Sequence, residues 1–300
     1  DYAPPGFLIS QANLDVELFE DYAQIRAVLS IARNPQAAAA PLMLDGEELE
    51  LVSVALDGRV LVGGEFVLDE RRLTIASVPP SFTLETVTRI RPRKNTRLMG
   101  LYGSKDGYFT QCEAEGFRRI TWFIDRPDVM ARYTVTIHAE REKYPVLLSN
   151  GNLVAQGEDT TPPADAGTPP RGGGESSSIA PGDYSTPPAG AGTPPRRGGE
   201  GGGRHWARWE DPFPKPCYLF AMVAAKLDRL EDTFVTRSGR TAQLAVYVEP
   251  GKLDQCGWAM QALKKSMKWD EEVFGLELDL DRYMIVAVGD FNMGAMENKG

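Results

Sequence analysis

Cysteine is scarce in this sequence, which has three cysteines among its 300 residues. Cys112, Cys217 and Cys256 lie far apart and form no CxxC pair, so neither a disulfide framework nor a thiolate zinc site is expected. A reducing compartment, either the cytoplasm or an organelle, therefore suits the protein best. The sequence starts at Asp1 without a basic and then apolar leader, so any targeting segment would have to precede it.

Long apolar runs and an excess of positive charge are missing as well. The longest run of large apolar residues, 218–225, is far shorter than the roughly 20 residues that cross a bilayer, so we expect no membrane span. The 33 Lys and Arg residues are outnumbered by 42 Asp and Glu residues, and the resulting net charge of −9 repels phosphate backbones. Nucleic acid is therefore not an expected partner.

Hydrophobic and charged residues occur in ordinary amounts, 42% and 25%, as in globular proteins. A length of 300 residues fits two compact domains of roughly 150 residues each. The hydrophobic pattern changes near residue 227, which predicts an N-terminal β domain, 1–226, and an incomplete second domain, 227–300.

Glycine and proline are concentrated in one segment. Residues 157–203 hold 22 of the 52 Gly and Pro residues, and 161–171 (TPPADAGTPPR) is nearly repeated at 186–196 (TPPAGAGTPPR). Too few large apolar side chains occur here to offset the entropy of ordering the chain, so we expect a disordered, partly polyproline insert in the β domain. A role as ligand of a proline-recognising domain is less expected, because the repeat lacks the PxxP spacing.

Short runs that alternate apolar and polar residues dominate the first half of the chain, and we expect them to be strands. They lie at 14–18, 51–56, 73–75, 82–90 and 133–139. Asp57-Gly58 predicts a tight hairpin turn before a strand at 60–62, and the Ser-Asn-Gly-Asn sequence at 149–152 predicts another hairpin. A further strand is expected at 206–209. The fold class is therefore mainly β, with a β-sandwich or a saddle-like sheet.

The last part of the chain has helical periodicity. The residues on one predicted face are Met260, Leu263, Met267 and Phe274, and those on an adjoining face are Trp258, Ala262, Trp269 and Val273. Asp254 is the expected N-cap and Gly275 the expected stop. The apolar run 283–288 predicts a strand buried on both faces. Because the chain stops soon afterwards, at Gly300, we expect the truncated start of an α+β domain.

The stretch Gly-Ala-Met-Glu-Asn at 294–298 is the most specific motif, and other stretches accompany it in a fixed order. They are TQCEAEGFR at 110–118, DRPD at 125–128, LSNGN at 148–152, DPF at 211–213, KPCYLF at 215–220, TRSG at 236–239 and MKWD at 267–270. Together these stretches resemble the M1 family of zinc aminopeptidases, in its bacterial and plant type. The resemblance implies that the second domain is the start of a thermolysin-like catalytic domain.

An aminopeptidase must recognise a free ammonium group, and carboxylates in a water-poor pocket do so through charge-assisted hydrogen bonds. A carboxylate held there without a partner is costly to desolvate, so the substrate cation completes the site. The resemblance implies that Glu297 is one such anchor and that Glu113, from the β domain, is the second. Glu115 lies two residues further on and would point the same way in a strand, so the residues alone leave the choice open; the family pattern favours Glu113.

Other substrate contacts follow from the same resemblance. Gln111 would line the pocket for the first side chain, and Met293 would cushion that side chain, although Met293 could also be core filler. Gly294 and Ala295 would offer backbone groups to the peptide, which must approach closely, and Met296 and Asn298 complete the expected binding segment. The expected partners are peptides with a free N-terminus, bound by a protein that is monomeric when full length.

Zinc is the cofactor that the resemblance implies, but its ligands are not expected in this chain. The family holds zinc with an HExxH helix beyond the Gly-Ala-Met-Glu-Asn motif, and neither His138 nor His205 begins such a motif. We expect both histidines to be strand residues and the zinc ligands to follow residue 300. No catalytic residue is therefore expected here, and the chain alone should not hydrolyse peptides.

Two other functions stay open. A relative that has lost its metal could serve as a non-catalytic binding scaffold, although such a scaffold would have no need for an ammonium clamp. A relative that hydrolyses epoxides is less expected, because its motif tends to Gly-Gly-Met-Glu-Asn, whereas Ala occupies position 295 here.

Overall fold

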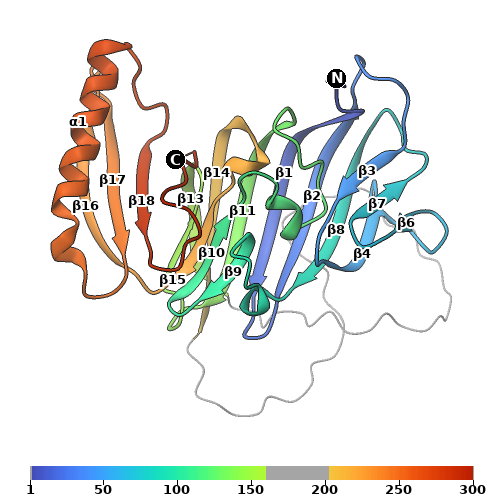
Figure 1. The fold of residues 1–300 in the computed structure, drawn as a ribbon, viewed down its shortest axis with the longest axis horizontal. Helices are drawn as coiled ribbons and strands as arrows, with labels where there is room; N and C mark the ends of the chain where they lie inside the picture. Colours follow the sequence, from blue (N-terminus) through green and yellow to red (C-terminus); the bar gives the residue numbers. More distant parts are fainter. Residues whose placement is uncertain (1, 160–202, 300) are drawn as a thin grey trace.

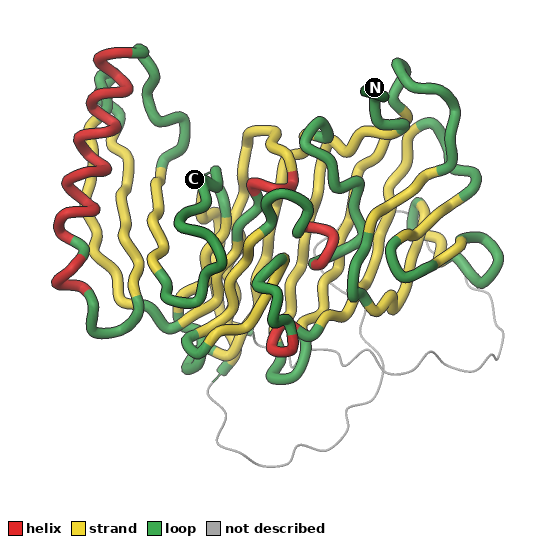
Figure 2. Tube along the Cα trace, viewed as in Figure 1, coloured by secondary structure: helices red, strands yellow, loops and turns green. Residues whose placement is uncertain are grey.

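The structure is a computed structural model that describes residues 2–159 and 203–299. Strands dominate it, as Figure 2 shows, which confirms the predicted mainly β class. The strands are β1 (Phe7–Leu18), β2 (Ala23–Arg33), β3 (Leu42–Asp45), β4 (Glu50–Leu56), β5 (Arg59–Val60), β6 (Val67–Leu68), β7 (Arg72–Ile75), β8 (Ser81–Ile90), β9 (Gly100–Ser104), β10 (Gly107–Gln111), β11 (Met130–Glu140), β12 (Val146–Ser149), β13 (Asn152–Glu158), β14 (Arg204–Pro216), β15 (Met222–Ala225), β16 (Asp228–Val235), β17 (Thr241–Val248) and β18 (Arg282–Ala287). The helices are α1 (Gly257–Val273) and short 3-10 helices at Pro92–Lys94, Phe117–Arg119, Cys217–Leu219 and Leu253–Gln255.

Within the described residues the largest sheet has eight strands, in the order β13-β14-β11-β1-β2-β8-β4-β5 (Figure 1). In β1, Leu14, Val16 and Leu18 are buried while the residues between them are partly exposed, which is the predicted alternation. A shared hydrophobic core joins this sheet to the sheet β12-β15-β10-β9 and to the small sheet β3-β7-β6. Sheets thus pack on sheets, as predicted from the sequence.

The Asp57-Gly58 turn joins β4 to β5 as predicted. Both residues have positive φ values, 48° and 78°, which a two-residue turn between antiparallel strands requires. The Asp57 carboxylate also accepts a hydrogen bond of 2.7 Å from the backbone N–H of Thr83 in β8. The strand after the turn is shorter than the predicted 60–62, because β5 ends at Val60.

Replacing Asp57 with alanine is expected to lower the free energy of unfolding by about 1–2 kcal/mol. The substitution removes the hydrogen bond to Thr83 and places an alanine in the left-handed conformation that asparagine and aspartate tolerate better. Urea unfolding of the two proteins measures the difference. Asp57→Asn, which keeps an acceptor for the backbone N–H of Thr83 and a residue that tolerates the left-handed conformation, is the control and should stay close to wild type. Equal stability of wild type and Asp57→Ala would contradict the account.

The turn at 149–152 is not the predicted hairpin. β12 ends at Ser149 and pairs with β15, whereas β13 begins at Asn152 and pairs with β14 in the large sheet. The turn is therefore a corner where the chain passes between sheets. Gly151, with φ of 85°, fits this corner because a Cβ atom there would lie 2.2 Å from the carbonyl oxygen of Glu210.

The predicted disordered insert, 157–203, lies almost wholly outside the described residues. At its start, Gly157 and Glu158 belong to β13, so the strand extends further than predicted. The strand predicted at 206–209 is part of β14, and β13 and β14 pair antiparallel. The insert therefore connects two neighbouring strands of the large sheet, as expected.

A separate sheet, β16-β17-β18, begins at Asp228, and α1 connects its parallel strands β17 and β18. Alternate residues of β17 point to its two faces. Ala245 and Tyr247 join the main core, whereas Leu244 and Val246 pack with Met260 and other buried residues of α1. This sheet is thus fixed to the β-rich part of the chain by one face and to the helix by the other.

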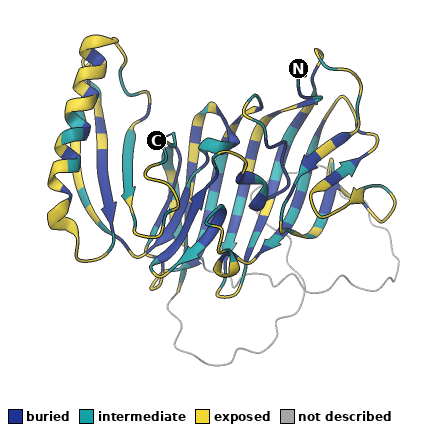
Figure 3. Ribbon diagram, viewed as in Figure 1, coloured by how far each residue is buried: buried dark blue, intermediate teal, exposed yellow. Residues whose placement is uncertain are grey.

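The predicted helix exists, but several of its details were wrong. Cys256, not Asp254, occupies the N-cap position, because Asp254 lies in a preceding 3-10 turn. Gly275 follows the helix end with φ of 67°, as expected for a terminating glycine. Trp258 and Trp269 do not pack in a core: they are 73% and 53% exposed, because the face of α1 that meets β17 is the one with Met260, Leu263 and Met267. Phe274, predicted on that same face, is 59% exposed because it follows the last helical residue, Val273. Figure 3 shows one side of α1 buried and the other exposed.

β18 is half-buried, not buried on both faces as predicted for 283–288. Its position explains this, since it is an edge strand of its sheet within the described residues, whereas the central strand β17 is buried on both faces. No helix in the described ranges is long and apolar enough to cross a membrane.

Candidate functional site

A cavity of about 580 Å³ lies between β18, with the segment that follows it, and the strands β10, β12 and β15. Figure 1 shows the C-terminal segment in dark red between β18 and the β-rich part of the chain. The lining residues are Phe109, Thr110, Leu148–Asn150, Ala221–Val223, Tyr283–Gly289, Phe291 and Met293–Asn298. Glu297 is the one charged residue among them, so the cavity carries a single carboxylate among apolar and neutral polar side chains.

The motif residues lie at this cavity. Met293, Gly294, Ala295, Met296, Glu297 and Asn298 all line it. Within the described residues, the Glu297 carboxylate makes no hydrogen bond or ion pair, so no cation of the chain neutralises it. Glu297 is exposed, so a positively charged ligand group that enters the cavity can reach this unpartnered carboxylate.

Gln111 and Glu113 lie one and three residues beyond the lining residue Thr110 and are not themselves among the lining residues. Gln111 is buried, and neither its Oε1 nor its Nε2 has a hydrogen-bond partner in the part of the chain that the structure describes. Buried amide groups are normally satisfied, so Gln111 is a group to which a polar ligand could bind. Glu113 is partly exposed and likewise has no partner there.

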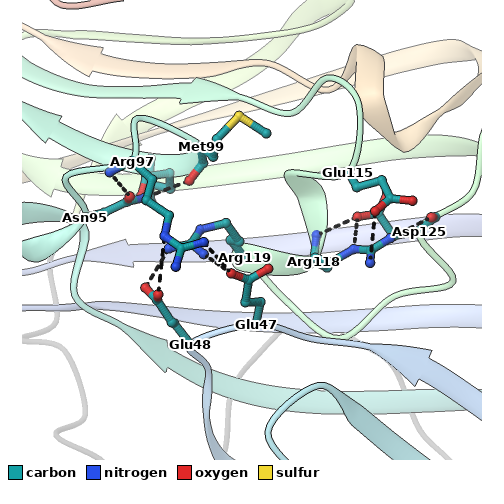
Figure 4. A network of polar contacts seen from close by, with 10 residues as sticks. Glu47, Glu48, Asn95, Arg97, Met99, Glu115, Arg118, Arg119 and Asp125 are labelled. Carbon is teal, nitrogen blue, oxygen red and sulfur yellow. Dashed lines mark hydrogen bonds and ion pairs between the residues drawn. The ribbon is translucent and has the colours of Figure 1, made fainter. Parts of the chain in front are cut away.

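Two arginines hold the loop that follows β10 (Figure 4). Arg118 donates from Nε to Asp125 at 2.9 Å and pairs with Glu115 at 3.3 Å. The buried Arg119 pairs with Glu47 at 2.6 Å, which ties the loop to the segment before β4. Glu115 is therefore already engaged by an arginine while Glu113 is not, a difference that sequence reasoning could not detect.

The segment after β18 is also hydrogen-bonded to the β-rich part, at Asp290 near the start of the segment. The hydroxyl of Tyr102 donates to the backbone carbonyl of Asp290 at 2.8 Å, and the hydroxyl of Ser104 donates to the Asp290 carboxylate at 2.7 Å. Burial, followed by the nearby Asp290 carboxylate, raises the pKa of Tyr102 to about 12, so its hydroxyl stays protonated and able to donate. No motif or spacing in the sequence indicated this contact.

Asn150 ties the other end of the same segment. Its amide nitrogen donates to the backbone carbonyls of Lys299, at 2.6 Å, and Leu219, at 3.1 Å. Its carbonyl oxygen accepts from the backbone N–H of Ala221 at 2.7 Å. Sequence reasoning assigned this residue only to a turn, although it belongs to the LSNGN stretch that supports the family resemblance.

Neither histidine provides a catalytic zinc site at the cavity. His138 lies in β11, as predicted, with Asp15 and Glu17 close enough to share a metal ion, but none of these three lines the cavity and Arg204 already pairs with Glu17. His205 lies in β14, as predicted, and its Nε2 hydrogen-bonds the backbone carbonyl of Tyr144. The described residues therefore do not fit a catalytic zinc site that faces the cavity.

Comparisons with known proteins agree with this arrangement. The Peptidase M1 N-terminal domain matches residues 10–162, and the Peptidase family M1 domain matches residues 258–300. Aminopeptidase N of Escherichia coli (strain K12) and Aminopeptidase N of Caulobacter vibrioides are each 47% identical over all of this chain. The chain covers 29% and 30% of those two proteins, respectively.

A solved structure shares the fold as well. The structure of Legionella pneumophila aminopeptidase A in complex with aspartic acid is 31% identical, with a TM-score of 0.81 over 98% of this chain and 30% of its own. The two family matches, the identity along the whole chain and the Gly-Ala-Met-Glu-Asn segment at the cavity lead to the same conclusion: this chain belongs to peptidase family M1.

Proposed function

We propose that this chain is the N-terminal part of a zinc-dependent aminopeptidase that removes residues from the free N-terminus of peptides. The observation that carries this proposal is the Glu297 carboxylate, which has no partner among the described residues and is the one charge lining the cavity. Such a carboxylate favours a cationic ligand group, and the terminal ammonium of a peptide supplies one.

The remaining residues take roles around that ammonium. Glu113 is the second anchor, Gln111 lines the pocket for the first side chain, and Met293 packs against that side chain. Gly294 and Ala295 offer backbone groups to the peptide, and Met296 and Asn298 complete the binding segment. The unpaired amide of Gln111 and the free carboxylate of Glu113, both among the described residues, support these assignments.

Zinc is the proposed cofactor because the chain belongs to a family of zinc peptidases, with ligands in residues beyond 300. Held by those residues, zinc would supply Lewis-acid chemistry and a more acidic bound water. The described residues hold no fitting ligand set, so we assign no catalytic residue to this chain. Its own contribution is to hold the ammonium group, which fixes where the first peptide bond lies.

The domain layout and the environment are also proposals. We place a β domain at 1–226 and the start of the catalytic domain at 227–300, since a new sheet begins at Asp228. Cys112, Cys217 and Cys256 are free and buried, which supports a reducing compartment, cytoplasmic or organellar. The proposed partners are peptides with a free N-terminus, and the full-length protein is proposed to be a monomer.

Peptide hydrolysis by the full-length protein tests the function. With zinc present, the protein should release the first residue from a peptide with a free N-terminus and leave the N-acetylated form of the same peptide intact. Removal of zinc by a chelator should abolish the release. No hydrolysis of the free peptide in the presence of zinc would contradict the proposal and leave the non-catalytic scaffold as the better interpretation.

A further inference from the structure

We infer that Asn150 is a positioning residue that fixes Glu297 for substrate recognition. This inference rests on the proposed function, in which Glu297 binds the terminal ammonium, and adds a residue of the β-rich part to that site. Asn150 itself lines the cavity, but its amide nitrogen and carbonyl oxygen are engaged by backbone groups and are not the substrate contacts in this account. It acts on the segment that carries Glu297.

Asn150 is placed to act as a rigid support. It is 4% exposed, and its side chain uses both its carbonyl oxygen and its amide nitrogen in hydrogen bonds to backbone. The contacts with Ala221 and Leu219 fix the side chain to the connection before β15. These two contacts hold the Asn150 side chain in one rotamer. Its third hydrogen bond, from Nδ2 to the backbone carbonyl of Lys299, therefore holds Lys299 in a fixed place relative to the β-rich part.

The contact with Lys299 lies close to the proposed anchor. Lys299 is two residues after Glu297, whereas the tie between Ser104 and Asp290 is seven residues before it. The segment between these ties is mostly exposed, and Gly294 has open space around it. Asn292, five residues before Glu297, also donates to the carbonyl of Leu98 at 3.0 Å, and the Lys299 ammonium lies over the Phe213 ring of β14. Among the described residues, the Asn150 bond is the hydrogen bond to the β-rich part that lies nearest to Glu297 along the chain.

A second asparagine of the same turn provides a matched control. Asn152 also joins the two parts of the chain, through a hydrogen bond of 3.3 Å from its Nδ2 to the carboxylate of Asp281. That contact precedes β18 and does not involve the segment that carries Glu297. If the variants only loosened the packing between the two parts of the chain, replacing either asparagine would impair hydrolysis. If Asn150 positions Glu297, only the Asn150 variants would impair hydrolysis.

The experiment compares Asn150→Ala, Asn150→Asp and Asn152→Ala in the full-length protein, with hydrolysis of a peptide that has a free N-terminus. Asn150→Ala removes all three hydrogen bonds and Asn150→Asp removes the two donated ones, and both variants lose the bond to Lys299. Both are expected to raise KM about five- to tenfold, while Asn152→Ala stays within twofold of wild type. Asn150→Asp keeps the acceptor for Ala221 and the size of the side chain, but its buried carboxylate faces the carbonyl oxygens of Leu219 and Lys299. Urea unfolding of each variant therefore accompanies the kinetics, and KM is compared only between variants that are folded under the assay conditions.

The aspartate variant also separates positioning from charge. An added carboxylate at the cavity would lower KM if electrostatic attraction alone governed binding, whereas loss of the amide donor raises KM if positioning governs it. A KM for Asn150→Asp at or below the wild-type value would overturn the inference.

A double-mutant cycle shows whether Asn150 acts through Glu297. If it does, Asn150→Ala combined with Glu297→Gln should be no worse than Glu297→Gln alone. If the loss of activity in the double variant equals the product of the losses in the two single variants, Asn150 acts independently of Glu297, which would contradict the inference. An impaired Glu297→Gln beside an unimpaired Asn150→Ala would refute the positioning role and leave the proposed function intact, whereas an unimpaired Glu297→Gln would refute the anchor itself.

Discussion

Glu297→Gln in the full-length protein is expected to lower kcat/KM for peptides with a free N-terminus by about a hundredfold or more. Glutamine keeps the size of the side chain but removes its charge, which is the one charge among the cavity-lining residues. Glu297 is exposed in the described structure, and in our account the bound peptide removes water from it. Breaking a charge pair that is desolvated in the complex costs about 3–5 kcal/mol, and about 3 kcal/mol corresponds to a hundredfold change. Steady-state kinetics with one unblocked peptide measure the loss.

Glu115→Gln is the matched control for this variant. Glu115 belongs to the same stretch as Glu113, but it is mostly exposed and pairs with Arg118, so its replacement should leave kcat/KM within about twofold of wild type. Unchanged kinetics of Glu297→Gln would remove Glu297 from ammonium recognition. Equal losses in the Glu297 and Glu115 variants would instead indicate a general effect of negative charge.

Lys215→Met is expected to destabilise the β-rich part by about 3–5 kcal/mol, the cost of leaving a buried charge without its partner. Lys215 donates to the Asp211 carboxylate at 2.9 Å, and both side chains are essentially inaccessible to water. Removal of the ammonium group leaves Asp211 buried without a counter-ion. Urea unfolding followed by tryptophan fluorescence measures the change, and an unchanged unfolding midpoint would contradict the prediction.

The double variant Lys215→Met with Asp211→Asn is the control for this pair. Asparagine removes the stranded charge and keeps an acceptor for the backbone N–H of Phe213, so much of the lost stability should return. The pH dependence gives a second check. Burial, partly offset by Asp211, lowers the pKa of Lys215 to about 8, so between pH 8 and about 10 the unfolded chain holds more protons on this residue. Wild-type stability should therefore rise over that range relative to Lys215→Met.

Local patterns were sufficient for some elements of the β-rich part of the fold. The alternation in Leu14, Val16 and Leu18 gave the correct strand and its buried face, because a period of two residues is a property of the strand itself. The Asp57-Gly58 turn was also correct, since its positive φ values depend on the local sequence.

Errors arose where the partner of a segment decides the structure. The Asn150-Gly151 sequence favours a tight turn, but whether the flanking strands pair with each other depends on β14 and β15, which lie far along the chain. Likewise, helical periodicity placed Trp258 and Trp269 on an apolar face, but the pattern could not show that β17 covers only one side of α1.

The residues of the candidate site likewise fall into those that the sequence identified and those that it did not. The family motif identified 293–298, and the structure places all six residues at the cavity. Asn150, Tyr102 and Ser104 were not identified, because each acts by a hydrogen bond to backbone or to a residue more than a hundred positions away. Such contacts depend on tertiary structure and leave no spacing pattern in the sequence.

The most direct test is a crystal structure of the full-length protein with a bound dipeptide that has a free N-terminus. The measured quantities are the distances from the terminal ammonium nitrogen to the carboxylate oxygens of Glu113 and Glu297. Our account predicts that both are about 3.2 Å or less, within hydrogen-bond range. An ammonium group bound elsewhere, or either carboxylate turned away into solvent, would contradict it.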